Sequence, residues 1–415
     1  MSARLRLIAS SILLPIVASA CTRSEPGTPT PTETTRTALP TGAQVPTDAG
    51  RIAVLDDVGS LSSVAPDGTD PVALADAVEG RAFARQPTWS PDGGKLAWVQ
   101  LDTSGGSLAA SVVTATTAGT QRTEAPTQVP PFYLSWDPTS SRVAYLGSST
   151  NAPGIEMGVV DVAGGGGEAV PLDTGSPFYF SWSPSGDRLL VHVGRDRLDT
   201  LALDGTASSL GARPGAFNTP VWTGDGRSFV YVSRVEGRQR LIVRDAERQG
   251  ERELAELEGP TRFVVNPDGS RVAFQAIEGD AGLGPLQVVD RRTGRISDVT
   301  DGTTPAFFWS PDGDRLLYLF VDPDDERIWL RWRIWGGPTQ IELPRFLPTP
   351  VFAREYLQFF DQYAQSMSLW APDGSAFTYA GIAESGGAGI WVQPARDGAD
   401  PILIGDGVFA SWSPA

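Results

Sequence analysis

Short apolar runs separated by tight polar turns recur along this chain. In the clearest copy, the apolar run 307–309 is followed by Ser310-Pro-Asp-Gly313 and then by a second apolar run, 316–320. Proline fixes the first φ angle of such a turn, aspartate bonds the adjacent backbone, and glycine takes the position with positive φ. The pattern predicts two short antiparallel strands joined as a β-hairpin.

The same hairpin pattern occurs eight times when the last copy, which stops after its first strand, is included. The residues that close the eight first strands are Trp89, Trp136, Trp182, Trp222, Val265, Trp309, Trp370 and Trp412. Their spacing runs from 40 residues (182 to 222) to 61 residues (309 to 370). Self-similarity at this period, with several short strands in each unit, predicts a β-propeller.

The two ends of the repeat region complement each other. The C-terminal unit has only a first strand, whereas the apolar runs at 51–55, 61–64 and 71–74 fit the second, third and fourth strands of a unit. We therefore expect an all-β fold, a single β-propeller of eight four-stranded blades over residues 51–415. The last strand would complete the first blade, which leaves no open sheet edge. A seven-bladed ring is the alternative.

The longest spacing contains an insertion over residues 344–366, in which residues 353–365 are expected to form a short helix. Its aromatic residues recur at helical spacing, so they either pack on the propeller or form a hydrophobic recognition patch. In the second case the two polar residues between them supply polar contacts. The candidate partner-binding residues are Tyr356, Phe359, Phe360, Asp361, Gln362 and Tyr363.

The N-terminus has the pattern of an export signal. Arg4 and Arg6 precede an apolar stretch, 7–17, that is too short to span a membrane comfortably. Small residues then lead to Cys21, the only cysteine of the chain. This arrangement resembles the bacterial lipoprotein signal, which implies that residues 1–20 are removed and that Cys21 is acylated. The alanine at position 18 departs mildly from that signal, and an ordinary secretory signal is the alternative.

Residues 21–50 are rich in Thr, Pro, Ser and Gly, so we expect a disordered tether that holds the folded part away from the membrane. The formal net charge of the chain is -16. That charge disfavours a nucleic-acid partner, which needs a basic face. We expect a monomer.

The residue inventory limits the chemistry. One cysteine and one histidine exclude an intrachain disulfide and a multi-histidine metal site, and we expect no cofactor. His192 lies within a predicted strand, and a packed strand residue is a better interpretation than a catalytic base. The acidic run Asp322, Asp324, Asp325 and Glu326 lacks the spacing of an EF-hand, so a solvated hairpin tip is favoured over a calcium site.

The Trp-Ser-Pro-Asp-Gly hairpins, such as 89–93 and 309–313, resemble the TolB-type, WD40-like β-propeller repeats. The resemblance covers residues 51–415. It implies an extracytoplasmic propeller that binds protein or peptide partners at one face or at a central channel. The chain departs from TolB in its eight expected blades, its expected lipid anchor and the lack of a preceding α/β domain.

Together these patterns predict a non-enzymatic, membrane-anchored, extracytoplasmic propeller that binds a protein or peptide of the cell envelope. Two alternatives remain. One is a glycan-active hydrolase or lyase that uses carboxylates in the channel. The other is a sensor that binds a small ligand or a sugar.

Overall fold

The computed structural model describes residues 49–148, 154–163, 167–247, 250–277, 282–324 and 328–414. These residues form antiparallel strands and turns with one short helical segment, which confirms the predicted all-β class. The predicted leader, Cys21 and nearly all of the predicted tether lie outside the described residues. None of the described helices has the length and apolar character needed to cross a membrane.

Six of the sheets have four strands each. Five of them follow the chain in order: β4 (Ala82–Trp89), β5 (Lys95–Asp102), β6 (Ala109–Thr116) and β7 (Thr123–Thr127); β8 (Pro131–Trp136), β9 (Arg142–Ser148), β10 (Ile155–Asp161) and β11 (Ala169–Gly175); β12 (Phe178–Trp182), β13 (Arg188–Val193), β14 (Arg197–Ala202) and β15 (Ala207–Ser209); β16 (Val221–Trp222), β17 (Ser228–Val235), β18 (Arg238–Asp245) and β19 (Glu251–Leu257); β20 (Thr261–Val265), β21 (Arg271–Ile277), β22 (Leu283–Asp290) and β23 (Ile296–Thr300).

The sixth four-stranded sheet joins the two ends of the described chain. It consists of β1 (Ile52–Leu55), β2 (Leu61–Val64), β3 (Val72–Ala75) and the last strand, β31 (Phe409–Trp412). Strand β31 pairs antiparallel with β1 and places Trp412 opposite Ile52. The N-terminal strands are therefore completed by a strand from the other end of the chain.

The remaining sheet has seven strands, because two hairpin units share it: β24 (Phe307–Trp309), β25 (Leu316–Pro323), β26 (Ile328–Trp335), β27 (Gln340–Pro348), β28 (Ala376–Ala383), β29 (Ala388–Pro394) and β30 (Ile402–Gly405). The end of β27 pairs with the end of β28, with Phe346 opposite Ala383. Residues 344–348, the first residues of the predicted insertion 344–366, continue β27. The register shift in β27 before Arg345 accommodates Pro344.

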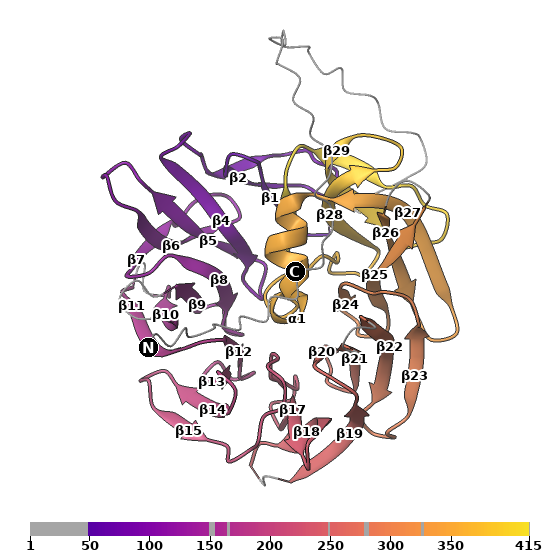
Figure 1. Cartoon of the computed structure of the whole chain (residues 1–415). Coiled ribbons are helices and arrows are strands. Elements are labelled where there is room, and N and C mark those ends of the chain that lie inside the picture. The colour runs from indigo at the N-terminus through magenta and orange to yellow at the C-terminus, as the bar shows by residue number, and fades with distance from the viewer. Residues whose placement is uncertain are drawn as a thin grey trace, which may run out of the picture. The chain divides into compact units, whose positions relative to one another are not determined.

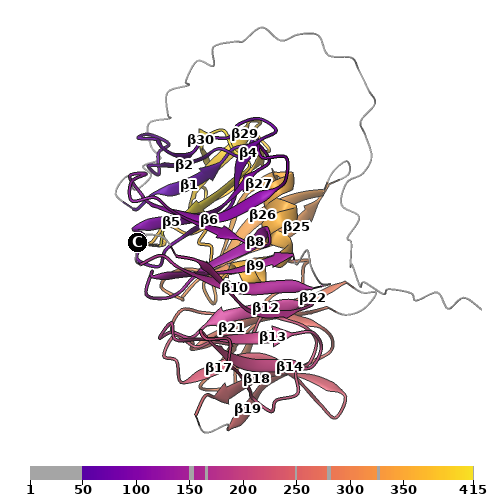
Figure 2. The same cartoon turned by 90° about the vertical axis from the view of Figure 1, so that its left-hand side faces the viewer.

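The sheets succeed one another around a helical segment that ends in α1 (Phe360–Tyr363), as Figure 1 shows. In the turned view of Figure 2, the same succession runs from β5 and β6 through β10 and β13 to β17 and β18. The first strands of the units, such as β8, β12, β20 and β24, surround the segment in Figure 1. Residues from distant parts of the sequence therefore meet at this centre.

The turn residues act as the sequence predicts. In the turn after β4, the Asp92 carboxylate accepts a hydrogen bond from the backbone N–H of Gly94 (3.0 Å), and Gly93 has φ +67°. Ser90 adds a bond that the pattern did not reveal, because its Oγ accepts from the backbone N–H of Lys95 at 2.9 Å. Both bonds keep the hairpin closed.

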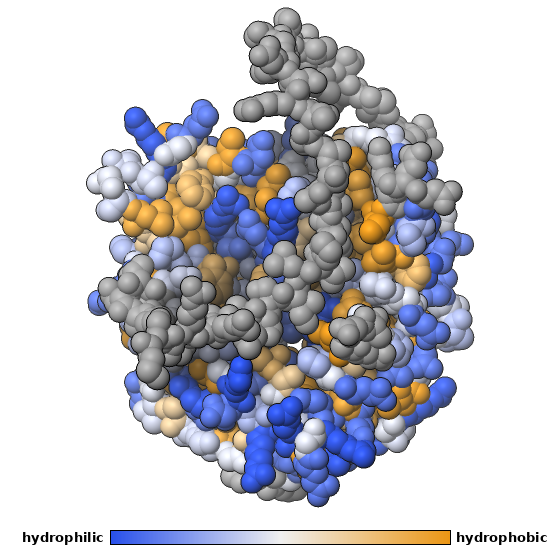
Figure 3. Space-filling view, in the orientation of Figure 1, coloured by the Kyte–Doolittle hydropathy of each residue, from blue (hydrophilic) through white to orange (hydrophobic). Residues whose placement is uncertain are grey.

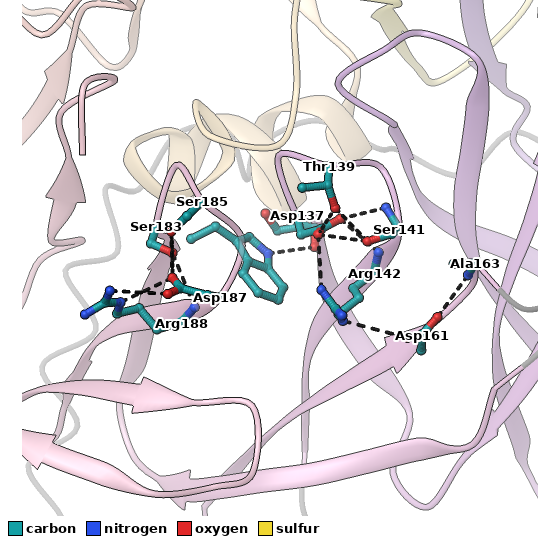
Figure 4. A network of polar contacts seen from close by, with 12 residues as sticks. Asp137, Thr139, Ser141, Arg142, Asp161, Ala163, Ser183, Ser185, Asp187 and Arg188 are labelled. Carbon is teal, nitrogen blue, oxygen red and sulfur yellow. Dashed lines mark hydrogen bonds and ion pairs between the residues drawn. The ribbon is translucent and has the colours of Figure 1, made fainter.

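Figure 4 shows the polar contacts within two successive turns, those that hold Asp137 and Asp187. The Asp137 carboxylate is buried and accepts from the backbone N–H groups of Ser141 and Arg142, both at 2.8 Å. A Cβ atom on Gly186 of the next turn would lie 3.0 Å from the Asp137 carboxylate. Glycine at this position therefore serves both the positive φ and the packing between units.

Several tryptophans that end the first strands tie their unit to the one before it. The indole Nε1 of Trp136 donates to the carbonyl oxygen of Thr88 (3.1 Å), and that of Trp182 donates to the carbonyl oxygen of Ser135 (3.2 Å). In both cases the acceptor residue precedes the anchor tryptophan of the previous unit. At these positions the repeated tryptophan is therefore an inter-unit hydrogen-bond donor as well as a core residue, whereas the indole nitrogens of Trp222 and Trp370 have no hydrogen-bond partner.

Candidate functional site

The helical segment at the centre, here called the central segment (residues 349–367), is less regular than predicted. It contains one π-helical turn (Phe352–Tyr356), one 3-10 turn (Leu357–Phe359) and the short helix α1 (Phe360–Tyr363). Its start is fixed by Thr349, whose hydroxyl oxygen accepts from the backbone N–H of Phe352 at 3.2 Å. The predicted helix is thus present in place, with mixed geometry.

The central segment turns most of its candidate residues inward. Among the six candidates, Phe359 alone is exposed, with 39% of its surface accessible. The five that are buried are Tyr356, Phe360, Asp361, Gln362 and Tyr363. The exposed aromatic patch proposed from the sequence is therefore reduced to one ring, and the docking alternative describes the other aromatic residues.

The buried aromatic rings of the central segment pack on the first strands of the surrounding sheets. Phe360 lies 4.5 Å from Phe307 of β24 between ring centroids, and Tyr356 stacks on Phe409 of β31 at 3.7 Å. The Tyr363 hydroxyl donates to Gln86 of β4 at 2.6 Å. These contacts hold the segment against β4, β24 and β31 at once.

Gln362 extends the same docking by hydrogen bonds. Its Nε2 donates to the hydroxyl of Tyr133 on β8 (2.9 Å) and to the carbonyl oxygen of Phe180 on β12 (3.0 Å). Its Oε1 accepts from the backbone N–H of Phe180 at 3.3 Å. The sequence analysis predicted that Gln362 contacts a partner, whereas in the structure its side chain forms hydrogen bonds within the protein.

The unit that begins at β16 is different. No hydrogen bond or ring contact among the described residues joins the central segment to β16, which has only two residues. The chain before it, residues 214–220, has no strand beyond an isolated bridge between Pro214 and Ser233. Phe217 and Asn218 of this stretch contact Tyr179 and His192, and Tyr179 interacts electrostatically with Arg262 and Asp361. We call these six residues the axial site: Tyr179, His192, Phe217, Asn218, Arg262 and Asp361.

The ring of Phe217 contacts two other rings of the axial site. Tyr179 on β12 lies opposite His192 on β13 in the strand register. The ring of Phe217 lies 4.6 Å from that of Tyr179 and 4.9 Å from that of His192. The Nδ1 atom of His192 is 3.0 Å from the carbonyl oxygen of Asn218. His192 is thus a buried strand residue, as the sequence predicts.

Several buried polar atoms of this site have no hydrogen-bond partner. They include both side-chain amide atoms of Asn218, which is 2% exposed, and Nε2 of His192, which is 1% exposed. The neighbouring Thr219 hydroxyl and the Nε of Arg262 also lack a partner. Buried polar groups normally have hydrogen-bond partners, so a cluster of buried polar atoms without partners needs an explanation.

Charge in the axial site comes from Asp361 and Arg262. Burial raises the pKa of the Asp361 carboxyl, and the attraction of Arg262 opposes that shift. Burial likewise raises the pKa of the Tyr179 hydroxyl, and the negative charge of Asp361 raises it further. Burial lowers the pKa of His192. Asp361, Arg262 and Tyr179 therefore act on one another through a poorly solvated interior.

The acidic run that the sequence analysis considered as a calcium site lies outside the axial site. The carboxylate of Asp322 accepts from Arg331 (2.8 Å), and that of Asp324 accepts from the indole of Trp329 (2.9 Å). Asp325 and Glu326 lie outside the described residues. Within the described ranges, no group of three or more His, Cys, Asp or Glu side chains is arranged to hold a metal ion.

A separate surface depression of about 540 Å³ is lined by Pro344, Ala383, Glu384, Ser385, Asp400 and Pro401. None of these residues belongs to the axial site, and none has a buried side-chain atom without a partner. Glu384 is paired with Arg345 at 3.2 Å. Figure 3 shows hydrophilic and hydrophobic residues interspersed over the visible part of the face around the centre. The axial site is therefore the better candidate.

Sequence reasoning missed Tyr179, Phe217, Asn218 and Arg262. One signal was available, because the distance of 40 residues between the anchors Trp182 and Trp222 is the shortest between any two successive anchors. Trp222 is also preceded by Phe217-Asn-Thr-Pro220 instead of an alternating apolar strand. Nothing local connects that irregular stretch to Asp361.

No protein-family model and no curated protein matches this sequence. Solved structures do. TolB from Acinetobacter baumannii is 17% identical with a TM-score of 0.39, over 68% of this chain and 60% of that chain. An oligogalacturonate lyase from Vibrio parahaemolyticus is 12% identical with a TM-score of 0.46, over 85% of each chain.

The β-propeller domain of the Trilobed protease from Pyrococcus furiosus is 11% identical with a TM-score of 0.47, over 77% of this chain and 97% of that domain. The chain is thus similar to TolB and to other β-propeller proteins at low identity. Because these proteins include a lyase and a protease as well as TolB, the similarity assigns no function.

Proposed function

We propose that this protein is a non-enzymatic β-propeller that binds a protein or peptide of the cell envelope at its centre. The observation that carries the proposal is the axial site, where buried hydrogen-bonding groups of Asn218 and His192 have no partner beside the rings of Tyr179 and Phe217. Polar groups of fixed direction beside aromatic surface are typical of binding sites.

We further infer that the eight hairpin units are eight blades and that β31 closes the ring. The pairing of β31 with β1 supports this inference. A second support is the close approach of Gly68, in the turn between β2 and β3, to Ile404 on β30, whose carbonyl oxygen would clash with a Cβ atom at Gly68. A closed ring has no free sheet edge, and its centre collects the first strands of all units.

We also propose that Cys21 carries a lipid that anchors the protein to the outer face of the cytoplasmic membrane. The small residues before the only cysteine support this proposal. The Thr- and Pro-rich residues 21–50 would then act as the spacer between membrane and propeller.

A glycan-active enzyme is the alternative that the sequence left open. Such an enzyme needs two carboxyl groups flanking the scissile bond. In the axial site the charged group that acts on Asp361 is Arg262, a cation. This composition favours binding over glycoside cleavage.

Two measurements test the proposal. Cys21→Ser should move the protein from the membrane fraction to the soluble fraction, and an unchanged distribution would remove the lipid anchor. The purified wild-type chain, mixed with detergent-solubilised envelope and cross-linked, should capture an envelope protein in a ratio near one to one. The same chain unfolded in urea before mixing is the control, and recovery of no partner above that control would overturn the binding function.

A further inference from the structure

Four arginines gather where the unit of β16–β19 meets the unit of β20–β23. Arg291, Arg292 and Arg295 lie in the turn between β22 and β23, and the guanidinium of Arg252 on β19 donates to the carbonyl oxygen of Arg291. We call these four residues the arginine patch. Arg291 is partly buried and the other three are exposed. Two neighbouring units therefore bring four cations together on a chain whose formal net charge is -16.

The turn that carries three of these arginines is closed by its own hydrogen bonds. The backbone N–H of Asp290 donates to the carbonyl oxygen of Arg295, and that of Gly294 donates to the carbonyl oxygen of Asp290, both at 2.9 Å. The Asp290 carboxylate accepts from the backbone N–H of Thr293 at 2.7 Å. The turn thus keeps its shape without the guanidinium groups, which are left for other contacts.

The arginine patch lacks the ion pairs that other arginines of the same units form. Arg244 pairs with Glu251 at 2.9 Å, and Arg271 pairs with Asp314 at 3.4 Å. Among the described residues, no such pair involves the arginine patch. Its guanidinium groups can therefore accept an external anion without giving up a carboxylate of the protein.

The carboxylates nearest to the patch are used by their own turns. Asp225 accepts from the hydroxyl of Thr223 at 2.6 Å, and Asp268 accepts from the backbone N–H of Ser270 at 2.8 Å. Burial lowers the pKa of Arg291, Asp225 and Asp268 oppose this shift, and the positive charge of Arg252 adds to it. Like charges held this close favour an anion beside them.

The arginine patch lies at the end of the strands where the described chain begins. β20 and β22 run in one direction, because each pairs antiparallel with β21, so the turn after β22 lies at the same end as the turn after β20. The turns after the first strands of successive units approach one another, as at Gly226 with Pro184. Trp412 ends β31 at the equivalent position, and its indole donates to the carbonyl oxygen of Ala49, the first described residue.

The central segment lies at the other end of the strands, because it follows β27, which runs antiparallel to β26. The proposed lipid on Cys21 therefore joins the propeller through the end that carries the arginine patch. Guanidinium groups bond phosphate oxygens well, and basic clusters close to a membrane attract anionic lipids. Ile296, which follows Arg295 and is 42% exposed, adds an apolar side chain suited to the headgroup region.

We propose that the arginine patch docks on anionic lipid headgroups and holds this end of the propeller against the membrane. The central segment then faces away from the membrane, toward a partner in the envelope. This inference rests on the membrane location within the proposed function and adds a second contact with that membrane. The acidic remainder of the surface is repelled by anionic lipid, which restricts the docking to the patch.

Vesicle sedimentation tests the docking. The mature chain, residues 21–415 with Cys21→Ser, carries no lipid, so its binding reports the protein surface alone. We expect it to sediment with vesicles of phosphatidylcholine and phosphatidylglycerol, mixed at about two to one, and to bind vesicles of phosphatidylcholine at least about tenfold more weakly. Binding should also fall as the salt concentration rises, because salt screens exposed charges.

Two double variants separate docking at the patch from general effects of charge. Arg292→Gln with Arg295→Gln should weaken binding by about tenfold or more and should leave the fold intact, because both side chains are exposed. Arg81→Gln with Arg354→Gln removes the same charge from exposed positions at the other end of the strands. This matched control should bind like the unsubstituted chain.

The inference is overturned if the lipid-free chain binds both kinds of vesicle equally, or if the two double variants bind alike. Glycerol phosphate, added at the concentration of the lipid phosphate, should not release the chain. Release would indicate a site for a soluble phosphate ligand and would also overturn the docking.

These outcomes differ from failure of the proposed function. The lipid anchor and the envelope partner are measured on the lipidated chain, so they stand if the lipid-free chain ignores anionic vesicles. Absence of any envelope partner would refute the binding function and leave the docking of the arginine patch untouched.

Discussion

The indole nitrogen of Trp89 donates a hydrogen bond of 3.1 Å to the backbone carbonyl of Ser411, a residue 322 positions later in the chain. The same bond joins Trp136 to Thr88 and Trp182 to Ser135 between units that are consecutive in sequence. The contact between the first complete unit and the C-terminal strand therefore has the same hydrogen bond as the contacts at Trp136 and Trp182.

Replacing this donor should weaken the junction between the ends. Trp89→Phe keeps an aromatic ring but leaves the Ser411 carbonyl without its partner, and we expect a loss of about 1–3 kcal/mol in the free energy of unfolding. Trp136→Phe, which removes the equivalent bond to Thr88, is the matched control and should lose a similar amount. Urea denaturation measures both. A destabilised Trp136→Phe beside an unaffected Trp89→Phe would argue against the junction.

The central segment should depend on the amide of Gln362. This side chain is 2% exposed, and its Nε2 donates two hydrogen bonds that a carboxylate cannot donate. Gln362→Glu should therefore cost about 3 kcal/mol or more near pH 7, because it buries an unpaired charge next to the Phe180 carbonyl. Gln358→Glu, at an exposed position of the same segment, should change stability little.

The loss in Gln362→Glu should also depend on pH in a defined direction. Burial raises the pKa of the introduced carboxyl in the folded state above its unfolded value. The neutral acid is thus favoured in the fold, so stability is greatest at low pH and falls as the pH rises through the folded pKa. Denaturation curves of this variant and of Gln358→Glu between pH 4 and 7 would check this, and a pH-independent difference would contradict it.

His192 should titrate below its ordinary range. Burial lowers its pKa from 6.5, and the neutral imidazole donates from Nδ1 to Asn218. Between the folded pKa and about 6.5 the unfolded chain binds more protons than the folded one, so stability falls as the pH is lowered through that window. NMR of the single imidazole, with the urea-unfolded protein as reference, measures the shift. Equal pKa values in both states would contradict the buried placement.

The hairpins were predictable because their chemistry is local. Gly93 with its positive φ and Asp92 with its bond to the next backbone N–H do in the structure what their residue types dictate. The period of the anchors then indicated repeated sheets. The role of the anchor tryptophans as donors to the preceding unit was not predictable, because it depends on how one unit packs against another.

The candidate site was harder to predict from the sequence. The aromatic spacing of the central segment revealed its helical character, but not that Asp361 and Gln362 point inward. Arg262 and Asn218 lie about a hundred residues or more before Asp361, and only the arrangement of the sheets brings them together. A pattern within one window cannot show which side chains lack a partner, since that depends on all the elements around them.

Cross-linking of β1 to β31 tests most directly the claim that the two ends of the chain meet in one sheet. Val54 lies opposite Ala410, so Val54→Cys with Ala410→Cys, in a Cys21→Ser background without other thiols, brings two Cβ atoms to the same side of adjacent strands. We predict an intramolecular disulfide under mild oxidation, seen as loss of both free thiols in the monomer. Val54→Cys with Ser411→Cys is the control, one residue out of register and facing opposite sides. Two free thiols in the first pair, or equal cross-linking in both pairs, would contradict the account.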